Sequence, residues 1–178
     1  MGRRAARHRF MPDFYVFPGG RLDTADYRVK PLTPLRAEVQ QSLCDSCDAR
    51  KAQALAVAAT RETFEETGLA LGKVENGAII PHLEPMDYVL RAITPPASPI
   101  RFHARFFAVE SRHLNGTLKS NGELLDLDWR PVEECLRLPV ADVTEFLLRQ
   151  FQKRKGERPA GVPLFSFRNG VAKVRTGS

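Results

Sequence analysis

The stretch RETFEETGL, from Arg61 to Leu69, carries the strongest structural and chemical signal in this chain. Its glutamates Glu62, Glu65 and Glu66 are spaced i, i+3 and i+4, so on an α-helix their carboxylates lie on one face. Carboxylates this close repel one another, and a hard divalent cation such as Mg²⁺ reverses that repulsion because it prefers carboxylate oxygens. The stretch therefore predicts a helix with a metal-binding face, with a solvated acidic surface as the alternative.

The residues around this stretch predict where its helix lies. The Ala-rich sequence from Ala49 to Thr67 offers apolar residues for an inward face and predicts one long helix. Gly68 is a residue that commonly ends a helix. Upstream, the aromatic run 14–17 leads into Pro-Gly-Gly at 18–20, which predicts a strand that enters a sharp turn.

These features together resemble the Nudix box, G-x5-E-x7-R-E-U-x-E-E-x-G-U, in which U is a bulky apolar residue. The matching residues are Gly20, Arg61, Glu62, Glu65, Glu66, Gly68 and Leu69. The chain departs from the pattern in that Thr63 stands at the first U, and Asp26 replaces the first glutamate. Arg61 also lies 41 residues after Gly20, where the pattern has 14. We assign the extra length to an insertion over residues 27–53, in a position where a longer loop is tolerated.

The resemblance implies an α/β fold, the Nudix α/β/α sandwich with a mixed central sheet, here with a helical insertion inside the box. It implies a single Nudix hydrolase domain over residues 1–178. A Nudix domain normally has a strand well before the turn, yet only sixteen residues precede Phe17. We therefore expect the opening strand to be very short or missing, and the N-terminus to be truncated.

The resemblance also implies hydrolysis of a phosphoanhydride bond, dependent on Mg²⁺ or Mn²⁺, in a nucleoside diphosphate linked to another group. The implied metal ligands are Glu62, Glu65 and Glu66, with the backbone carbonyl of Gly20 as a further oxygen. Arg61 is implied to orient the glutamates through charge-assisted hydrogen bonds. These five residues form the predicted catalytic and metal-binding set.

The general base varies in position within the family. One recurrent solution is a loop glutamate six residues before a tryptophan, and Glu123 stands six residues before Trp129. Glu123 is therefore a candidate base or distal metal ligand, with an exposed turn glutamate as the equally supported alternative. Glu66 is the other candidate base. Arg101 and Arg105, on a predicted strand, are candidate substrate-phosphate contacts, and surface salt bridges explain them equally well.

The substrate is less well defined by the sequence. The residues around the turn and the split box are similar to coenzyme A diphosphatases of the mitochondrial and peroxisomal type and their bacterial relatives, which makes CoA or acyl-CoA the leading substrate. ADP-ribose, NADH and dinucleoside polyphosphates remain open. Two other functions also remain open. One is a non-catalytic nucleotide-binding or regulatory module. The other is an RNA-decapping activity, whose signature would be a steep salt dependence of RNA binding.

The remaining sequence predicts further elements. Strands are expected at 78–80, 88–93, 101–109 and 125–130, with Trp129 packed inward, helices at 132–138 and 143–153, and an edge strand at 163–167. A short helix is expected within 35–43, inside the insertion. The insertion is a candidate for a dimer contact or a substrate lid, and a homodimer stays open.

Composition narrows the class of protein. The 178 residues are 43% hydrophobic and 27% charged, which is typical of one globular domain. The sequence lacks an apolar run of membrane-spanning length and the apolar stretch of a secretory signal. Cys44, Cys47 and Cys135 are too few for a disulfide framework, and the lone CxxC lacks further zinc ligands. We expect reduced thiols in the cytoplasm.

The chain is basic, with a net charge of +6. Basic residues cluster at both ends: Arg3, Arg4, Arg7, His8 and Arg9 at the start, and Lys153, Arg154, Lys155 and Arg158 near the end. Such a surface favours phosphate-rich partners, although solvated charge is the favoured interpretation of both clusters. We expect a small-molecule nucleotide diphosphate as partner and no membrane. Nucleic acid is not favoured, because the aromatic and basic interleaving of an RNA-binding sheet is not clear.

Overall fold

The computed structural model describes residues 1–6, 11–95, 97–98, 100–154 and 161–176. Its elements in chain order are β1 (Gly2–Arg4), β2 (Tyr15–Val16), η1 (Asp26–Arg28), α1 (Ala37–Cys44), α2 (Ala49–Thr67), β3 (Leu69–Ala70), β4 (Gly72–Glu75), β5 (Ala78–Pro81), β6 (Asp87–Ile93), β7 (His103–Ala108), η2 (Ser111–His113), β8 (Asn115–Gly116), β9 (Leu124–Leu125), α3 (Val132–Cys135), α4 (Asp142–Arg154), β10 (Pro163–Arg168) and β11 (Val171–Thr176). The basic residues Arg7, His8, Arg9, Lys155 and Arg158 lie outside the described residues.

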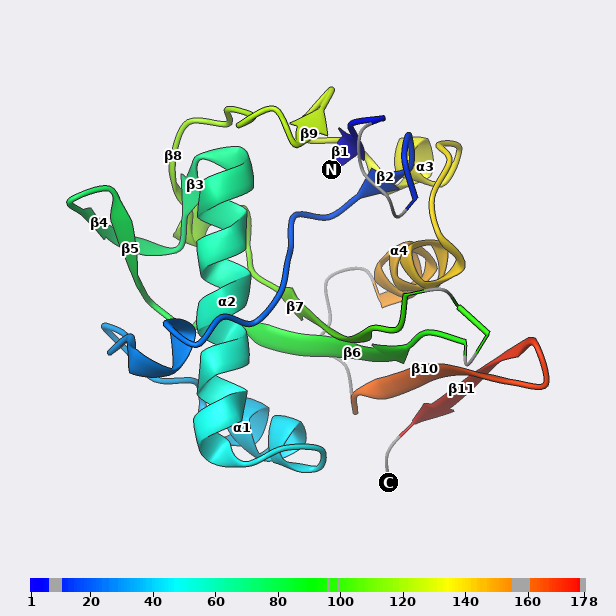
Figure 1. Ribbon diagram of the computed structural model, residues 1–178, viewed down its shortest axis with the longest axis horizontal. Helices are drawn as coiled ribbons and strands as arrows, with labels where there is room; N and C mark the ends of the chain where they lie inside the picture. The colour runs from blue at the N-terminus through cyan, green and yellow to red at the C-terminus, as the bar shows by residue number, and fades with distance from the viewer. Residues whose placement is uncertain (7–10, 96, 99, 155–160, 177–178) are drawn as a thin grey trace.

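The main sheet has the strand order β11-β10-β6-β7 and separates two layers of helices (Figure 1). It is mixed, because β10 runs parallel to β6 while its other pairings are antiparallel. One core cluster joins α1 and α2 to Tyr88 and Phe107, and the other joins Leu147 of α4 to Leu90 and Phe165. The predicted α/β/α sandwich with a mixed sheet is confirmed.

A smaller sheet holds the N-terminal strand beside the turn. Strand β1 lies between β2 and β9, so that Arg3 pairs with Tyr15 on one side and with Leu125 on the other. Strand β1 is short, with three residues. Its pairing ties the turn after Val16 to the loop before Leu124, and this brings two distant segments of the candidate site together.

The segment 27–53 belongs to the core. Leu35, Val39 and Leu43 are buried against α2, so the predicted helix in this segment is confirmed as α1. Arg36 fastens the segment to β6, since its guanidinium pairs with Asp87 and donates to a backbone carbonyl in the turn before that strand. These contacts place α1 beside the N-terminal half of α2, at the opposite end of the helix from the glutamates (Figure 1).

Three sequence predictions were wrong in part. The strand expected at 125–130 is limited to Leu124–Leu125, and Trp129 is 59% exposed, not packed inward. The chain turns away after β9 because Asp126 has a φ of 50° and its carboxylate binds the Tyr15 hydroxyl and Arg130. The strand at 163–167 exists but is internal, since β11 pairs along its outer side. The helix expected at 132–138 ends at Cys135.

No helix in the described part of the chain has both the length and the apolar character needed to cross a membrane.

Candidate active site

Helix α2 carries the glutamates and is fixed at both ends. The Asp48 side chain accepts a hydrogen bond from the Lys51 N–H at 2.8 Å and caps the N-terminus. Gly68 ends the helix in the left-handed conformation with a φ of 71°. A Cβ at Gly68 would lie 2.7 Å from the Thr117 carbonyl oxygen, so glycine is required there for a second reason. The predicted helix over 49–67 is confirmed, with its last turn held at a defined position.

Arg61 is the centre of a hydrogen-bond network on this helix. Its guanidinium donates to both carboxylate oxygens of Asp26, at 2.9 and 3.1 Å, and to the Arg21 carbonyl oxygen at 3.0 Å. It also donates to Glu62 at 2.8 Å and Glu65 at 3.1 Å. Hydrogen bonding to Asp26 raises the pKa of Arg61 above its usual value. A fixed positive charge therefore lies between the turn and two of the three glutamates.

The Gly-Gly turn approaches the same helix face. The Gly19 N–H donates to Glu66 Oε2 at 2.8 Å. A Cβ built on Gly20 would lie 2.2 Å from the carboxylate carbon of Glu62, so the Gly20 backbone lies directly against that side chain. The turn and the glutamates, far apart in sequence, thus meet as the resemblance implied.

Glu66 is the most perturbed carboxylate at the site. The residue is 7% exposed, and its burial raises the pKa of the carboxyl to about 7. The Gly19 hydrogen bond and the charge of Arg4 act in the opposite direction, while the negative charges of Glu62 and Glu123 raise the pKa further. A carboxyl with a pKa close to neutral can exchange a proton at physiological pH.

Glu123 lies in an exposed turn that faces this cluster. Its backbone N–H donates to Asn121 Oδ1 at 2.9 Å, and its carbonyl oxygen accepts a hydrogen bond from the Ala5 N–H at 3.2 Å. The side chain is exposed but close enough to act on the charge of Glu66. The structure therefore brings Glu123 to the side of the glutamate face, near the end of β1.

The donor set fits a hard cation chemically, since it consists of carboxylate and carbonyl oxygens. Within the described residues, however, no three His, Cys, Asp or Glu side chains are gathered in a metal-holding arrangement as they stand. The reason is that Glu62 and Glu65 turn toward Arg61, and Glu66 toward the Gly19 N–H. After burial, the negative charges of Glu62 and Glu123 also raise the pKa of Glu66, and this negative charge is what a cation would neutralise.

A small cavity of about 170 Å³ opens beside the network. Its lining includes Val29, Arg61, Phe64, Glu65 and Ile79, from η1's end, α2 and β5. Phe64 follows Thr63, the residue that departs from the box pattern, and it supplies an apolar wall here. The cavity connects the charged network to an apolar surface between α2 and the β4–β5 hairpin.

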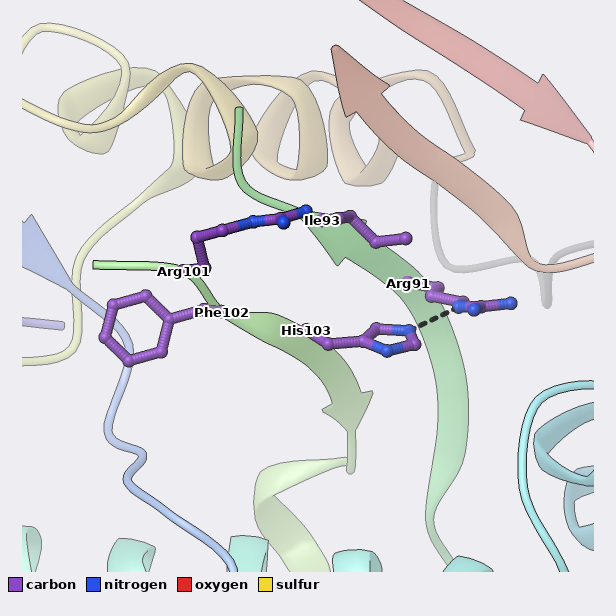
Figure 2. Close-up of a pocket in the computed structure, with 5 residues that line it drawn as sticks. All are labelled: Arg91, Ile93, Arg101, Phe102 and His103. Carbon is purple, nitrogen blue, oxygen red and sulfur yellow. Dashed lines mark hydrogen bonds between the residues drawn. The ribbon is translucent and has the colours of Figure 1, made fainter. Parts of the chain in front are cut away.

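The two arginines predicted to contact substrate lie elsewhere. Arg101 lines an open pocket at the start of β7, together with Arg91 and His103 (Figure 2). Arg105 donates to the Ser46 hydroxyl at 3.1 Å, just before α2 begins. Helix α2 begins at Ala49, and Glu62 lies about 20 Å from this start at a rise of 1.5 Å per residue, so Ser46 and Glu62 are at opposite ends of this part of the helix. The structure therefore does not bring either arginine together with the glutamates.

Two contributors to the site were not predicted from the sequence. Arg4 acts electrostatically on Glu66, although it belongs to a basic cluster interpreted as solvated charge. The Gly19 N–H is a donor to the same carboxylate. The sequence signal for both was weak, because each depends on how β1 and the turn pack against α2.

Comparison with solved structures reveals a similar fold. The crystal structure of a NUDIX hydrolase from Alicyclobacillus acidocaldarius matches this chain with a TM-score of 0.65 and 24% sequence identity, over 90% of this chain and 88% of that one. This chain has the Nudix fold. No family model matches the sequence, and no significant match is found among curated proteins. The fold prediction is confirmed, while the CoA-cleaving branch and the roles of individual residues remain predictions.

Proposed function

We propose that this protein hydrolyses a phosphoanhydride bond in a nucleoside diphosphate linked to another group, with Mg²⁺ or Mn²⁺ as cofactor. The observation that supports this most directly is the convergence of Glu62, Glu65 and Glu66 with the Gly19-Gly20 turn and Arg61. An ordinary solvated helix face would not bury a glutamate to 7% exposure beside two other carboxylates.

The ligands of the metal would be Glu62, Glu65 and Glu66, with the Gly20 carbonyl oxygen and Glu123 as further donors. When bound, the metal ion would neutralise phosphate charge and lower the pKa of a water molecule. Arg61 holds Glu62 and Glu65 in place from the Asp26 side.

Glu66 is our first candidate for the general base. Of the three helix glutamates it is the most buried, and burial raises its pKa to about 7 in the metal-free protein, so its surroundings favour proton uptake. Glu123 is the second candidate, because its exposed carboxylate acts on the same cluster from the loop before β9. The rates of Glu66→Gln and Glu123→Gln distinguish the two assignments, since the variant that lacks the base should lose more activity.

CoA or acyl-CoA is our leading substrate, with ADP-ribose, NADH and dinucleoside polyphosphates as the competitors. The proposal rests on the resemblance of the turn and the split box to CoA-cleaving Nudix enzymes. The cavity beside Arg61 and Glu65 is small, so it fits one part of such a substrate and not the whole molecule. Arg101 and Arg105 lie away from the glutamates, so this proposal does not assign them a contact with the substrate.

Hydrolysis of a substrate panel tests the proposal. CoA, an acyl-CoA, NADH, ADP-ribose and a dinucleoside polyphosphate are each incubated with Mg²⁺, Mn²⁺ or EDTA, and products are separated by chromatography. We expect metal-dependent release of adenosine 3′,5′-bisphosphate from CoA. Glu65→Gln and Glu66→Gln should each lower kcat by about 100-fold or more, in the range of a lost general base.

Glu75→Gln is the matched control, because Glu75 is an exposed glutamate that pairs with Lys73 on the β4–β5 hairpin. It should keep the wild-type rate. Equal rates in Glu65→Gln, Glu66→Gln, Glu123→Gln and Glu75→Gln would contradict the assignment. Nucleotide binding without turnover of any member of the panel would favour the non-catalytic binding module.

A further inference from the structure

A row of basic side chains crosses the main sheet on the face opposite α4. Residues paired across neighbouring strands point to the same face of a sheet. Arg105 of β7 pairs with Arg91 of β6, and Arg91 pairs with Leu164 of β10. Leu164 pairs in turn with Arg175 of β11. Three arginines and one leucine therefore lie side by side over about 14 Å, at the usual strand spacing of about 4.8 Å.

The alternation of side chains shows that this face is not the one covered by α4. The neighbours Ala92 and Phe165 pack into the core with Leu147 of α4, so Arg91 and Leu164 point to the other side. On that side, α1 and α2 cover only the end of the sheet near Tyr88. The basic row begins at this covered end, where Arg105 donates to the Ser46 hydroxyl, and continues beyond it toward β11.

More positive charge surrounds the row. Figure 2 shows Arg91, Arg101 and His103 around an open pocket of about 400 Å³, with Arg91 Nε donating to His103 Nε2 at 2.6 Å. Lys173 follows on the same face of β11, two residues before Arg175, and both are exposed. Lys51 of α2 also acts on His103.

These cations lack the carboxylate partners that other arginines of the chain have. Arg36, Arg61, Arg112, Arg130 and Arg149 each form an ion pair with Asp or Glu. Within the described residues, no such pair is formed by the cations in and around the row, which are Arg91, Arg101, Arg105, Lys173 and Arg175.

The positive charge around the row also acts on the His103 imidazole. Burial, with Arg105, Arg91 and Lys51, lowers the pKa of His103 to about 4, so the ring is neutral and accepts the Arg91 hydrogen bond at physiological pH. The Nε atom of Arg105 is buried without a hydrogen-bond partner. This atom is not accessible to a ligand, so the evidence for anion binding is the positive charge of the neighbouring exposed side chains.

We propose that this basic row binds the phosphates of a single-stranded nucleic acid, at a site separate from the glutamates of α2. The row is too long for one phosphate group to contact all of it, so a ligand with several phosphates is favoured. A membrane surface is less well supported, because binding in the interface requires apolar side chains that insert, and Leu164 and Ile93 in the row are half-buried. Contacts to phosphate alone would make the binding insensitive to base sequence.

Binding of a labelled single-stranded oligonucleotide of about 12 residues, a length within the range of known single-strand sites, tests the proposal by fluorescence anisotropy. Salt is varied between about 50 and 200 mM. Arg91→Gln/Arg175→Gln should weaken binding by about tenfold at the low salt concentration. It should also reduce the slope of log K against log salt by about 1.4, since each lost phosphate contact to a single strand contributes about 0.7.

Arg112→Gln/Arg149→Gln is the matched control, because it removes the same charge from two exposed arginines that have carboxylate partners. It should leave the affinity within about twofold and the slope unchanged if binding is local to the row. Lys173→Gln/Arg175→Gln is the second test variant, since both side chains lie exposed on the outer strand and their loss cannot disturb the core.

Three outcomes would overturn the proposal. These are no binding of the oligonucleotide to the wild type, equal losses in the row and control variants, and binding to vesicles of anionic lipid without binding to the oligonucleotide. The hydrolysis assay separates this site from the proposed active site, because Lys173→Gln/Arg175→Gln should keep the wild-type turnover of the small-molecule substrate.

Discussion

At the level of single residues, Asp26 shows how a shorter side chain occupies a position where the box pattern has glutamate. The carboxylate is 2% exposed and receives two hydrogen bonds from Arg61 and one from the Asp23 N–H. The 3₁₀ turn Asp26–Arg28 brings the backbone of Asp26 close to α2. The aspartate therefore reaches Arg61 although its side chain is one methylene shorter than that of glutamate. Arg61 and Asp26 form a mostly buried pair, and this makes each dependent on the other.

Arg61→Met should destabilise the protein by about 3 kcal/mol, because it leaves a buried carboxylate without its partner. For a chain of this size we expect the midpoint of thermal unfolding to fall by about 6–12 °C. Urea unfolding measures the change in free energy and thermal unfolding measures the midpoint, both followed by circular dichroism. Arg61→Met/Asp26→Asn should recover part of the loss, whereas Arg149→Met, which removes an exposed arginine, should change little. Equal effects of the two methionine variants would contradict the network.

Gly20→Ala should reduce activity without unfolding the protein. The added Cβ would lie within 2.4 Å of the Glu62 carboxylate atoms, and this flexible side chain can move only by leaving its place against the turn. We expect kcat to fall by about tenfold or more, as for a small misplacement of a catalytic group, with a nearly unchanged melting temperature. A variant with wild-type kcat would show that the position of Glu62 beside the turn is not needed.

The raised pKa of Glu66 predicts that the metal-free protein loses stability as the pH rises. The native carboxyl titrates near 7 and the unfolded one near 4.5, so between these values the native state binds more protons. Stability should be highest below about pH 4.5 for this group and fall until about pH 7, by about 3 kcal/mol at most. Urea unfolding in EDTA across this range measures it. Glu66→Gln should give a flatter profile, and parallel profiles would contradict the prediction.

At the level of elements, the end of α2 is set by a glycine for two separate reasons. Gly68 has a φ of 71° and also approaches the Thr117 carbonyl closely, whereas Gly77, in the β4–β5 turn, has a φ of 79° and open space around it. The two positions thus share the backbone conformation and differ in their surroundings. Substitution of Gly77 therefore measures the cost of the left-handed conformation alone, and substitution of Gly68 measures that cost together with the overlap with the Thr117 carbonyl.

Gly77→Ala should cost about 1 kcal/mol, the usual penalty of the left-handed conformation for a residue with a Cβ. Gly68→Ala should cost about 3 kcal/mol, because the Cβ also overlaps a backbone oxygen. Urea unfolding of both variants measures the difference. Equal costs would mean that the segment after β8 moves aside without penalty.

At the level of the whole molecule, metal binding should be linked to folding. The proposed donors come from the segment at 19–20, from α2 and from the loop at 121–123, so an unfolded chain cannot present them together. At a metal concentration 100 times the Kd we expect stabilisation of about 2.7 kcal/mol, or about 5–10 °C in the melting temperature. Differential scanning fluorimetry with Mn²⁺ or EDTA measures this.

The double variant Glu62→Gln/Glu66→Gln should lose the Mn²⁺-dependent shift, and Glu75→Gln should retain it. Glu75 lies on the β4–β5 hairpin and pairs with Lys73, so its loss reports only on unspecific binding of the ion. Retention of the full shift by the double variant would place the metal elsewhere on the protein.

Much of this protein follows from local sequence signals. The stretch 61–69 determined a helix, its acidic face and its glycine end, because spacing on a helix depends only on the 3.6-residue period. The Pro-Gly-Gly sequence predicted a sharp turn, where the structure has a bend at Pro18. The apolar runs at 78–80 and 88–93 determined strands β5 and β6. These signals were sufficient for the fold, whereas the roles of the glutamates remain a proposal.

Tertiary structure alone decided what depends on contacts between distant segments. Trp129 is exposed because Asp126 turns the chain toward Tyr15 and Arg130, which no local pattern contains. The burial that raises the pKa of Glu66 comes from the packing of its neighbourhood, including the turn at Gly19. The basic row exists only because strand pairing places single arginines from β6, β7 and β11 side by side. Register and burial are properties of the folded chain, so the sequence patterns of the separate segments could not reveal them.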